Sequence, residues 1–297
     1  MSAASQPATS ARRRWIDAIA TVDRRLIFLV IGAGVAIPLL FPLGLPVGVS
    51  REATAYHEAI EALAPGDIVI FAFDYEPDVM AEVDPMSYAT LSRIFAKGVR
   101  VVALADYAGG VGIALRILGE TARESGRQYG SDYVFLGYNP DYTATMLRMG
   151  ESIRQTFPTD HYGTPTGELA LMREVDNYAG VDLLVSISGS ALAEYWVIFA
   201  GGKFGQKVIA GNTAIQAVLI YPYFQTGQLS GFLGGLKGAA EYEQLIGRRG
   251  LGLRGMDAQS VAHLLIVCFI VLGNVGYFTA RARRRGEAGG MGRGHVG

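Results

Sequence analysis

The segment Asp67-Ile-Val-Ile-Phe-Ala-Phe73, which is followed by Asp74, decides the fold of this chain. The turn pair Pro65-Gly66 precedes it, and every residue from Ile68 to Phe73 is apolar. An unbroken apolar run of this length, without alternation of polar and apolar residues, is typical of a strand that is buried on both faces. The segment therefore predicts the first strand of a parallel sheet.

Four similar runs follow along the chain, and segments with helical spacing of their apolar residues separate them. Repeated alternation of strand and helix predicts an α/β domain with right-handed crossovers. We expect a doubly wound, mostly parallel five-stranded sheet of the Rossmann-like or flavodoxin-like kind. The predicted strands cover 67–73, 99–105, 133–138, 181–187 and 207–210; the predicted helices cover 86–97, 111–125, 142–157, 168–178 and 191–200, with a last helical region over 214–246.

Polar residues follow the end of each predicted strand. In an open parallel sheet, ligands bind beyond the carboxyl ends of the strands, so these residues form a candidate ligand-binding edge. The alternative is that they only start turns and cap helices, as Asp, Asn and Ser often do. The candidate residues are Asp74, Glu76, Asp106, Gly109, Gly110, Asn139, Ser188 and Asn212.

Three kinds of chemistry at this edge were weighed against a purely structural role. Gly109 and Gly110 lie between a strand and a helix, where backbone amides can approach an anion, but the spacing is not G-x-G-x-x-G and Asp106 would repel the anion. Ser188-Gly-Ser190 occupies the place of a nucleophile elbow but lacks the first glycine of G-x-S-x-G. The acidic residues could hold a hard cation such as Mg²⁺ or Ca²⁺, although their spacing matches no EF-hand loop. We therefore expect no cofactor, no metal and no catalytic residue; the acidic residues after the first strand are Asp74, Glu76, Asp78, Glu82 and Asp84.

Two uncharged apolar stretches bracket the domain, at 26–50 and 258–280. Each exceeds the roughly 20 residues that a helix needs to cross a hydrocarbon core. The sequence thus predicts an integral membrane protein with two transmembrane helices. Its expected parts are a basic tail over 1–25, a transmembrane helix over 26–50, an α/β domain over 51–257, a second transmembrane helix over 258–280 and a basic tail over 281–297.

Arginine residues favour one orientation of this arrangement. Ten of them lie on the outer flanks of the two stretches, against four on the inner flanks. Positively charged flanks stay in the cytoplasm, so we expect both termini in the cytoplasm and the domain on the outer side of the cell (inner) membrane. The single Cys268 lies in the second stretch, and the domain therefore has no disulfide.

No charged residue lies between Lys207 and Lys237. Within this segment Gly231, Gly235 and Ala239 have the i, i+4, i+8 spacing of one helical stripe, along which a second helix could approach closely. Three interpretations were left open: a buried strand and helix of the core, a surface that packs on a partner or a second copy, and a segment that dips into the membrane.

These patterns lead to two functional hypotheses. The first is a non-catalytic domain that acts as a membrane-anchored scaffold, with the stripe of Gly231, Gly235 and Ala239 as its interface. The expected partners are the lipid bilayer and either further copies of the chain or another membrane protein, with no nucleic acid. The alternative is a sensor or enzyme that binds a small ligand or cation at the polar edge of the sheet.

Overall fold

The computed structural model describes residues 23–291, so residues 1–22 and 292–297 of the two expected tails lie outside the described part. The chain divides into two compact units. One consists of residues 44–256, and the other combines the residues up to Leu43 with those from Asp257 onwards. The two units are described separately below.

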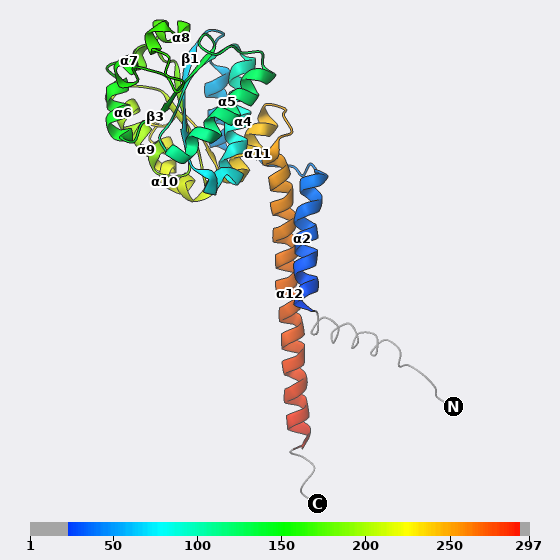
Figure 1. The fold of residues 1–297 in the computed structure, drawn as a ribbon. Coiled ribbons are helices and arrows are strands. Elements are labelled where there is room, and N and C mark those ends of the chain that lie inside the picture. Colours follow the sequence, from blue (N-terminus) through cyan, green and yellow to red (C-terminus); the bar gives the residue numbers. More distant parts are fainter. Residues whose placement is uncertain (1–22, 292–297) are drawn as a thin grey trace, which may run out of the picture. The chain divides into compact units, whose positions relative to one another are not determined.

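Residues 44–256 form an α/β domain around one parallel sheet (Figure 1). The strand order is β3-β2-β1-β4-β5-β6, so the order reverses between β1 and β4. The predicted α/β class and the parallel sheet are confirmed. The strands are β1 (Ile68–Asp74), β2 (Arg100–Ala105), β3 (Tyr133–Tyr138), β4 (Leu183–Ser188), β5 (Val208–Asn212) and β6 (Phe232–Gly234).

The predicted number of five strands is wrong, because β6 adds a sixth. It pairs in parallel with β5, with Ala210 opposite Phe232. The helical region expected over 214–246 is interrupted after Gln225, and Gly227 at φ 78° turns the chain back toward the sheet. At three residues, β6 is too short to carry the apolar run by which the other strands were recognised.

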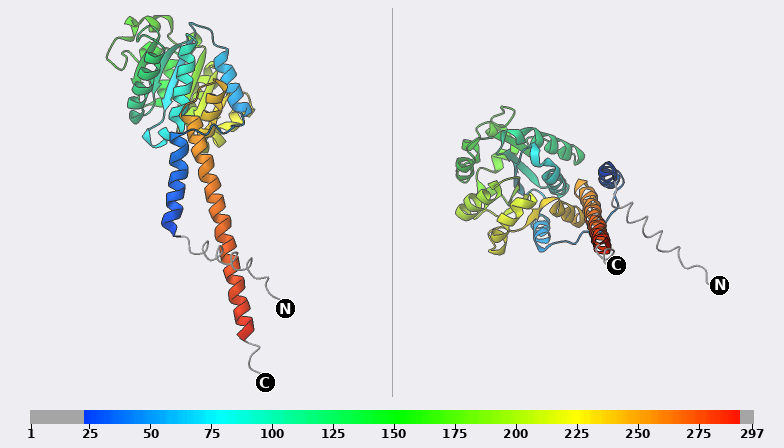
Figure 2. Two further views of the ribbon diagram at one scale, coloured as in Figure 1. Left: turned by 90° about the vertical axis from the view of Figure 1, so that its right-hand side faces the viewer. Right: turned by 90° about the horizontal axis from the view of Figure 1, so that it is seen from below.

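Helices cover both faces of the sheet (Figure 2). Alternate side chains of β1 explain the two cores: Phe71 and Phe73 point to one face, and Ile70 and Ala72 to the other. The Phe73 face is covered by α3 (Arg51–Glu61), α4 (Met80–Ala96), α5 (Val111–Glu124) and α11 (Gly235–Leu245); the Ala72 face is covered by α6 (Tyr142–Met149), α7 (Ile153–Thr156), α8 (Ala170–Glu174), α9 (Leu192–Tyr195), the π-helix η5 (Trp196–Gly202) and α10 (Ala214–Gln225).

The predicted glycine stripe on one helix is not formed. Gly231 precedes β6, Gly235 takes φ 61° at the start of α11, and only Ala239 lies inside that helix. All three are buried by the domain itself. Close backbone approach does occur, since a Cβ added at Gly231 would lie 2.3 Å from the backbone nitrogen of Tyr56 in α3. The small residues therefore let β6 and α11 pack within the domain.

The second unit contains α2 (Arg24–Leu40) and most of α12 (Leu251–Met291), which begins in the α/β domain. Among residues 23–291, one helix is long and apolar enough to cross a membrane by length and composition: Leu251–Thr279, with a mean hydropathy of 2.1. It contains nearly all of the second predicted stretch, 258–280.

The prediction of two transmembrane helices is wrong for the described residues, because the stretch over 26–50 forms no helix long enough to count as a candidate span. Helix α2 has 17 residues, which is about 26 Å at 1.5 Å per residue, and residues 41–50 are not helical. The chain contains Pro42 and Pro46 directly after α2, and Gly44 takes φ 69°, so the helix cannot continue. Within this unit α2 lies against α12 at Gly34, where an added Cβ would meet Leu265 at 2.4 Å.

Candidate functional site

The strands end level with one another at the carboxyl edge of the sheet. Asp74 of β1 is in register with Ser188 of β4, and Ser188 with Asn212 of β5. On the other side Phe73 is in register with Ala105, so Asp106 comes next to Asp74. Residues in register on neighbouring strands point to the same face, which here is the face covered by α9 and η5. The structure thus brings the predicted residues Asp74, Asp106, Ser188 and Asn212 to one edge and one face.

Asp74 is the centre of this group and has no exposed surface. Its Oδ2 accepts hydrogen bonds from Ser186 Oγ at 2.6 Å and from Trp196 Nε1 at 2.8 Å. Trp196 is fully buried and begins the π-helix η5. π-Helical turns are rare in proteins, and those that occur are often found at functional sites. This one starts at Trp196, whose side chain donates a hydrogen bond to the carboxylate of Asp74.

Asp106 is the second carboxyl group, and it is 2% exposed. Among the described residues, neither of its oxygens has a hydrogen-bond donor, and neither does Oδ1 of Asp74. An unpartnered buried acceptor costs free energy, and this group contains three such oxygens.

The electrostatics of the pair favour one shared proton near neutral pH. Burial raises the pKa of Asp74 to about 6, against the hydrogen bonds from Ser186 and Trp196, which lower it. Burial raises the pKa of Asp106 well above its ordinary value, and the charge of Asp74 raises it further. Like charges in one buried site cannot both form easily, so the pair retains one proton after the first has left.

The polar group continues along the edge to Asn212, whose Oδ1 also lacks a donor among the described residues. Four of the eight buried side-chain atoms without a partner there belong to Asp74, Asp106 and Asn212, all on this face of the sheet. The concentration of unpaired acceptors at one edge distinguishes it from the rest of the domain. It is the arrangement expected of a site that awaits hydrogen-bond donors.

Two loops close over the carboxyl pair. Tyr107, after β2, donates from its hydroxyl to Ser190 Oγ, after β4, at 3.1 Å. Ser188 Oγ accepts from Ser190 N at 3.1 Å and so fixes the turn into α9. The Tyr107–Ser190 contact ties together the loops on either side of β1 and keeps the pair covered.

The other predicted residues of the edge have structural roles. Asn139 accepts from the backbone nitrogen of Asp141 at 3.2 Å, which is the turn that the capping alternative expects. Glu76 is exposed, and a Cβ at Gly109 would lie 2.7 Å from its Oε1. A Cβ at Gly110 would lie 2.8 Å from the carbonyl oxygen of Tyr75, so this glycine is needed for packing of the turn against the end of β1.

No group of three or more His, Cys, Asp or Glu side chains in the described part of the chain is placed to hold a metal ion. Two acidic residues after β1 have other partners. Glu82 accepts from the backbone nitrogen of Ala214 at 2.7 Å, and Asp84 pairs with Arg116. The acidic cluster that the sequence offered as a cation site is therefore dispersed, and only Asp74 of that cluster points into the buried edge.

Sequence reasoning missed Trp196 and Tyr107. Ser186 has a signal in the sequence, because it is a polar residue inside the apolar run of β4. Trp196 had none, because an aromatic residue on an apolar segment indicates only core packing. Their role depends on β4 being next to β1, which the order of strands in the sequence does not reveal.

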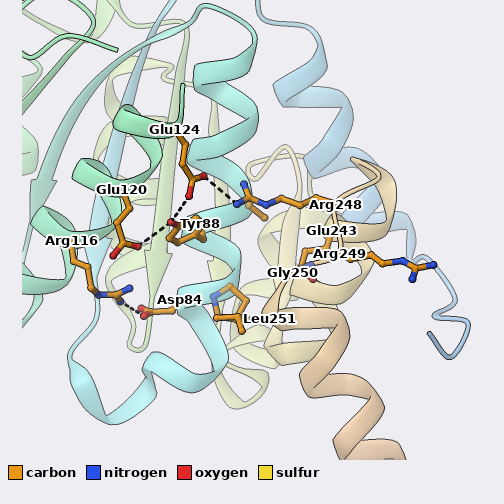
Figure 3. Close-up of a pocket in the computed structure, with 12 residues that line it drawn as sticks. Asp84, Tyr88, Arg116, Glu120, Glu124, Glu243, Arg248, Arg249, Gly250 and Leu251 are labelled. Atoms are coloured by element: carbon orange, nitrogen blue, oxygen red, sulfur yellow. Dashed lines mark hydrogen bonds and ion pairs between the residues drawn. The ribbon is translucent and has the colours of Figure 1, made fainter. Parts of the chain in front are cut away.

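A concave site lies on the opposite face of the domain, between α4, α5, α11 and the first turn of α12 (Figure 3). It has a volume of about 360 Å³. Its charged groups pair with one another: Tyr88 donates to Glu120 at 3.0 Å, and Arg248 lies 3.5 Å from Glu124. Arg248 also lies over the ring of Tyr88, at 5.2 Å from its centre.

Glu243, at the edge of this cavity, holds the start of α12. Its carboxylate accepts hydrogen bonds from the backbone nitrogens of Gly250, Gly252 and Leu253 at 3.1, 2.9 and 2.8 Å. The first N–H groups of a helix have no partner within the helix, so the carboxylate satisfies them and the positive end of the helix dipole stabilises its charge. The charged side chains around the cavity are therefore accounted for by contacts with one another and with the first turn of α12.

The chain matches no family model, and no curated protein matches it. A solved structure described as the crystal structure of AibC is similar to it, with a TM-score of 0.30 and 14% sequence identity. The similarity covers 75% of this chain and 54% of that chain, so the chain spans about half the length of the protein that it matches. This similarity carries no argument about function, which rests on the site itself.

The raised pKa values of the carboxyl pair predict that Asp106→Asn changes the thermal stability of the protein by an amount that depends on pH. A group whose pKa is higher in the folded than in the unfolded protein stabilises the fold at low pH, and this stabilisation is lost as the pH rises through the folded pKa. The variant should therefore unfold at a higher temperature than the wild type at pH 8. At pH 5 the difference in unfolding temperature between the variant and the wild type should be smaller.

Thermal unfolding of the full chain in detergent, followed by tryptophan fluorescence, measures this effect. Asp78→Asn is the matched control, because Asp78 is exposed on the loop after β1. The difference in unfolding temperature between Asp78→Asn and the wild type should be the same at pH 5 and at pH 8. An equal stability difference for Asp106→Asn at pH 5 and pH 8 would show that Asp106 is not protonated by its surroundings.

Proposed function

We propose that residues 44–256 form a Rossmann-like, doubly wound domain that binds a small ligand at the edge between β1 and β4, and that α12 anchors this domain in a membrane. The reversal of strand order between β1 and β4 supports the location, because ligands of such sheets bind where the order reverses. The observation that carries the proposal is the buried group of unpaired acceptor oxygens on Asp74, Asp106 and Asn212 at this place.

The chemistry of the site indicates the class of ligand. Its unpaired atoms are carboxylate and amide oxygens, all of which accept hydrogen bonds and three of which belong to the carboxyl pair, which carries negative charge. A protonated amine supplies both the donors and the opposite charge. We therefore propose a primary amine as the group that enters the site.

Binding of an amine would be linked to release of the shared proton. With a cation between them, both carboxylates can ionise, because the cation replaces the proton that otherwise separates the two charges. The free energy that the empty pair costs the fold would then be recovered on binding. A destabilising polar group that is retained in a core is typical of functional sites, where stability is exchanged for function.

The scaffold hypothesis has less support than ligand binding. Its interface was the stripe of Gly231, Gly235 and Ala239, and these residues are buried inside the domain. Assembly with further copies or with another membrane protein therefore has no described surface on that stripe. The amine-binding edge, in contrast, has both a location in the sheet and a defined chemistry.

A binding experiment with matched probes tests the proposed function. n-Butylammonium should raise the unfolding temperature of the full chain, and more at pH 8 than at pH 5, because the proton competes with the amine at low pH. Butyrate, which has the same length and the opposite charge, should have no effect. The variant Asp74→Asn with Asp106→Asn should lose the response to the amine. Stabilisation by MgCl₂ but not by the amine, or an equal amine response in the double variant, would contradict the proposal.

We also propose that the domain lies on the outer side of the cell membrane, with the C-terminus in the cytoplasm. The five arginines that follow the second apolar stretch, against three that precede it, support this orientation. A reporter enzyme that is active only in the cytoplasm, fused after Gly297, should be active. Protease added to spheroplasts should digest the domain. Protection of the domain from that protease would reverse the proposed orientation.

A further inference from the structure

Helix α10 has an unusual surface for a helix of a folded domain. Ile215, Val218 and Leu219 are 80%, 71% and 55% exposed, and with the exposed Pro222 they have the i, i+3, i+4, i+7 spacing of one stripe. The opposite side of the helix is also apolar, since Ile220 is buried in the core. A helix that is apolar all round is normally covered on every side, so the exposed stripe lacks a partner within the domain.

We propose that the exposed stripe of α10, formed by Ile215, Val218, Leu219 and Pro222, docks on the surface of the lipid bilayer. No charged residue occurs between Lys207 and Lys237, so the helix and its flanks can approach the lipid without removing a charge from water. The aromatic residues Tyr221, Tyr223 and Phe224 follow at its carboxyl end, and such residues are enriched at membrane interfaces.

A basic residue completes the pattern of an interfacial helix. The guanidinium carbon of Arg51 lies over the ring of Phe224, 5.8 Å from its centre. Apolar and aromatic side chains together with a neighbouring arginine are the combination that binds the boundary between headgroups and acyl chains.

The connectivity of the chain keeps α10 within reach of a membrane. Arg51 begins α3, and only seven residues separate it from the other unit, which ends at Leu43. Seven residues span at most about 25 Å. Helix α10 also packs against α11, which ends at Leu245, six residues before α12 starts. Both connections to the apolar unit thus leave the domain from elements that contact α10, and this tether raises the effective concentration of lipid near the stripe.

Site-directed fluorescence in lipid nanodiscs tests this inference on the full chain. Cys268 is the single cysteine, so Cys268→Ser gives a background in which Val218→Cys or Ile215→Cys carries one environment-sensitive nitrobenzoxadiazole label. Arg123→Cys on α5 is the matched control, because Arg123 is also exposed on a helix of the same domain. Nanodiscs are made of phosphatidylcholine with or without a nitroxide on the acyl chain.

The labels at 218 and 215 should emit at shorter wavelength than the label at 123 and should lose fluorescence in the nitroxide nanodiscs, while the label at 123 should not. Absence of nitroxide quenching at both α10 positions would overturn the proposal. Labels that emit at shorter wavelength but are not quenched would also overturn it, because a second copy of the chain would then shield them from water. Energy transfer between differently labelled copies would reveal such a contact. The test does not involve the carboxyl pair, so its outcome is independent of amine binding.

Discussion

A parallel sheet that is covered by helices on both faces can place charged side chains only where its strands end. Every interior position of β1 is buried, so the first residue that can carry charge is Asp74 at its carboxyl end. The same rule applies to Asp106, Ser188 and Asn212 on the neighbouring strands, and the level register collects them on one face. The polar edge is therefore a direct consequence of the sheet, and the site depends on that constraint.

The carboxyl pair at this edge is a cost to the fold that the rest of the domain compensates. Ser186 and Trp196 satisfy one oxygen of Asp74 and leave the other oxygens of the pair without donors among the described residues. Replacing Asp106 by a neutral residue would remove the repulsion, yet the chain holds a second acid there. The hydrogen bond between Tyr107 and Ser190 joins the loops after β2 and β4, and Asp74 and Asp106 have almost no exposed surface.

The sequence alone predicts the parallel α/β sheet and the location of the polar edge, because apolar runs mark buried strands and the residues after them mark one edge. It does not predict β6, whose three residues form a strand only because β5 offers them a free edge. It does not predict the role of Trp196, which depends on β4 lying next to β1 and on the π-helix that begins at this residue. The stripe of Gly231, Gly235 and Ala239 shows the limit of spacing arguments, since a positive φ at Gly235 ends the periodicity on which the stripe relied.

The most direct test of this account is the protonation state of Asp74 and Asp106 at neutral pH. Infrared spectroscopy of the full chain at pH 7 should show the carbonyl band of a protonated carboxyl group, which a carboxylate lacks. That band should fade as the pH is raised and should be absent from the variant with both Asp74→Asn and Asp106→Asn. Identical spectra of the wild type and the double variant in this region at pH 7 would mean that both carboxyl groups are ionised, and would contradict the account of a buried pair that holds one proton.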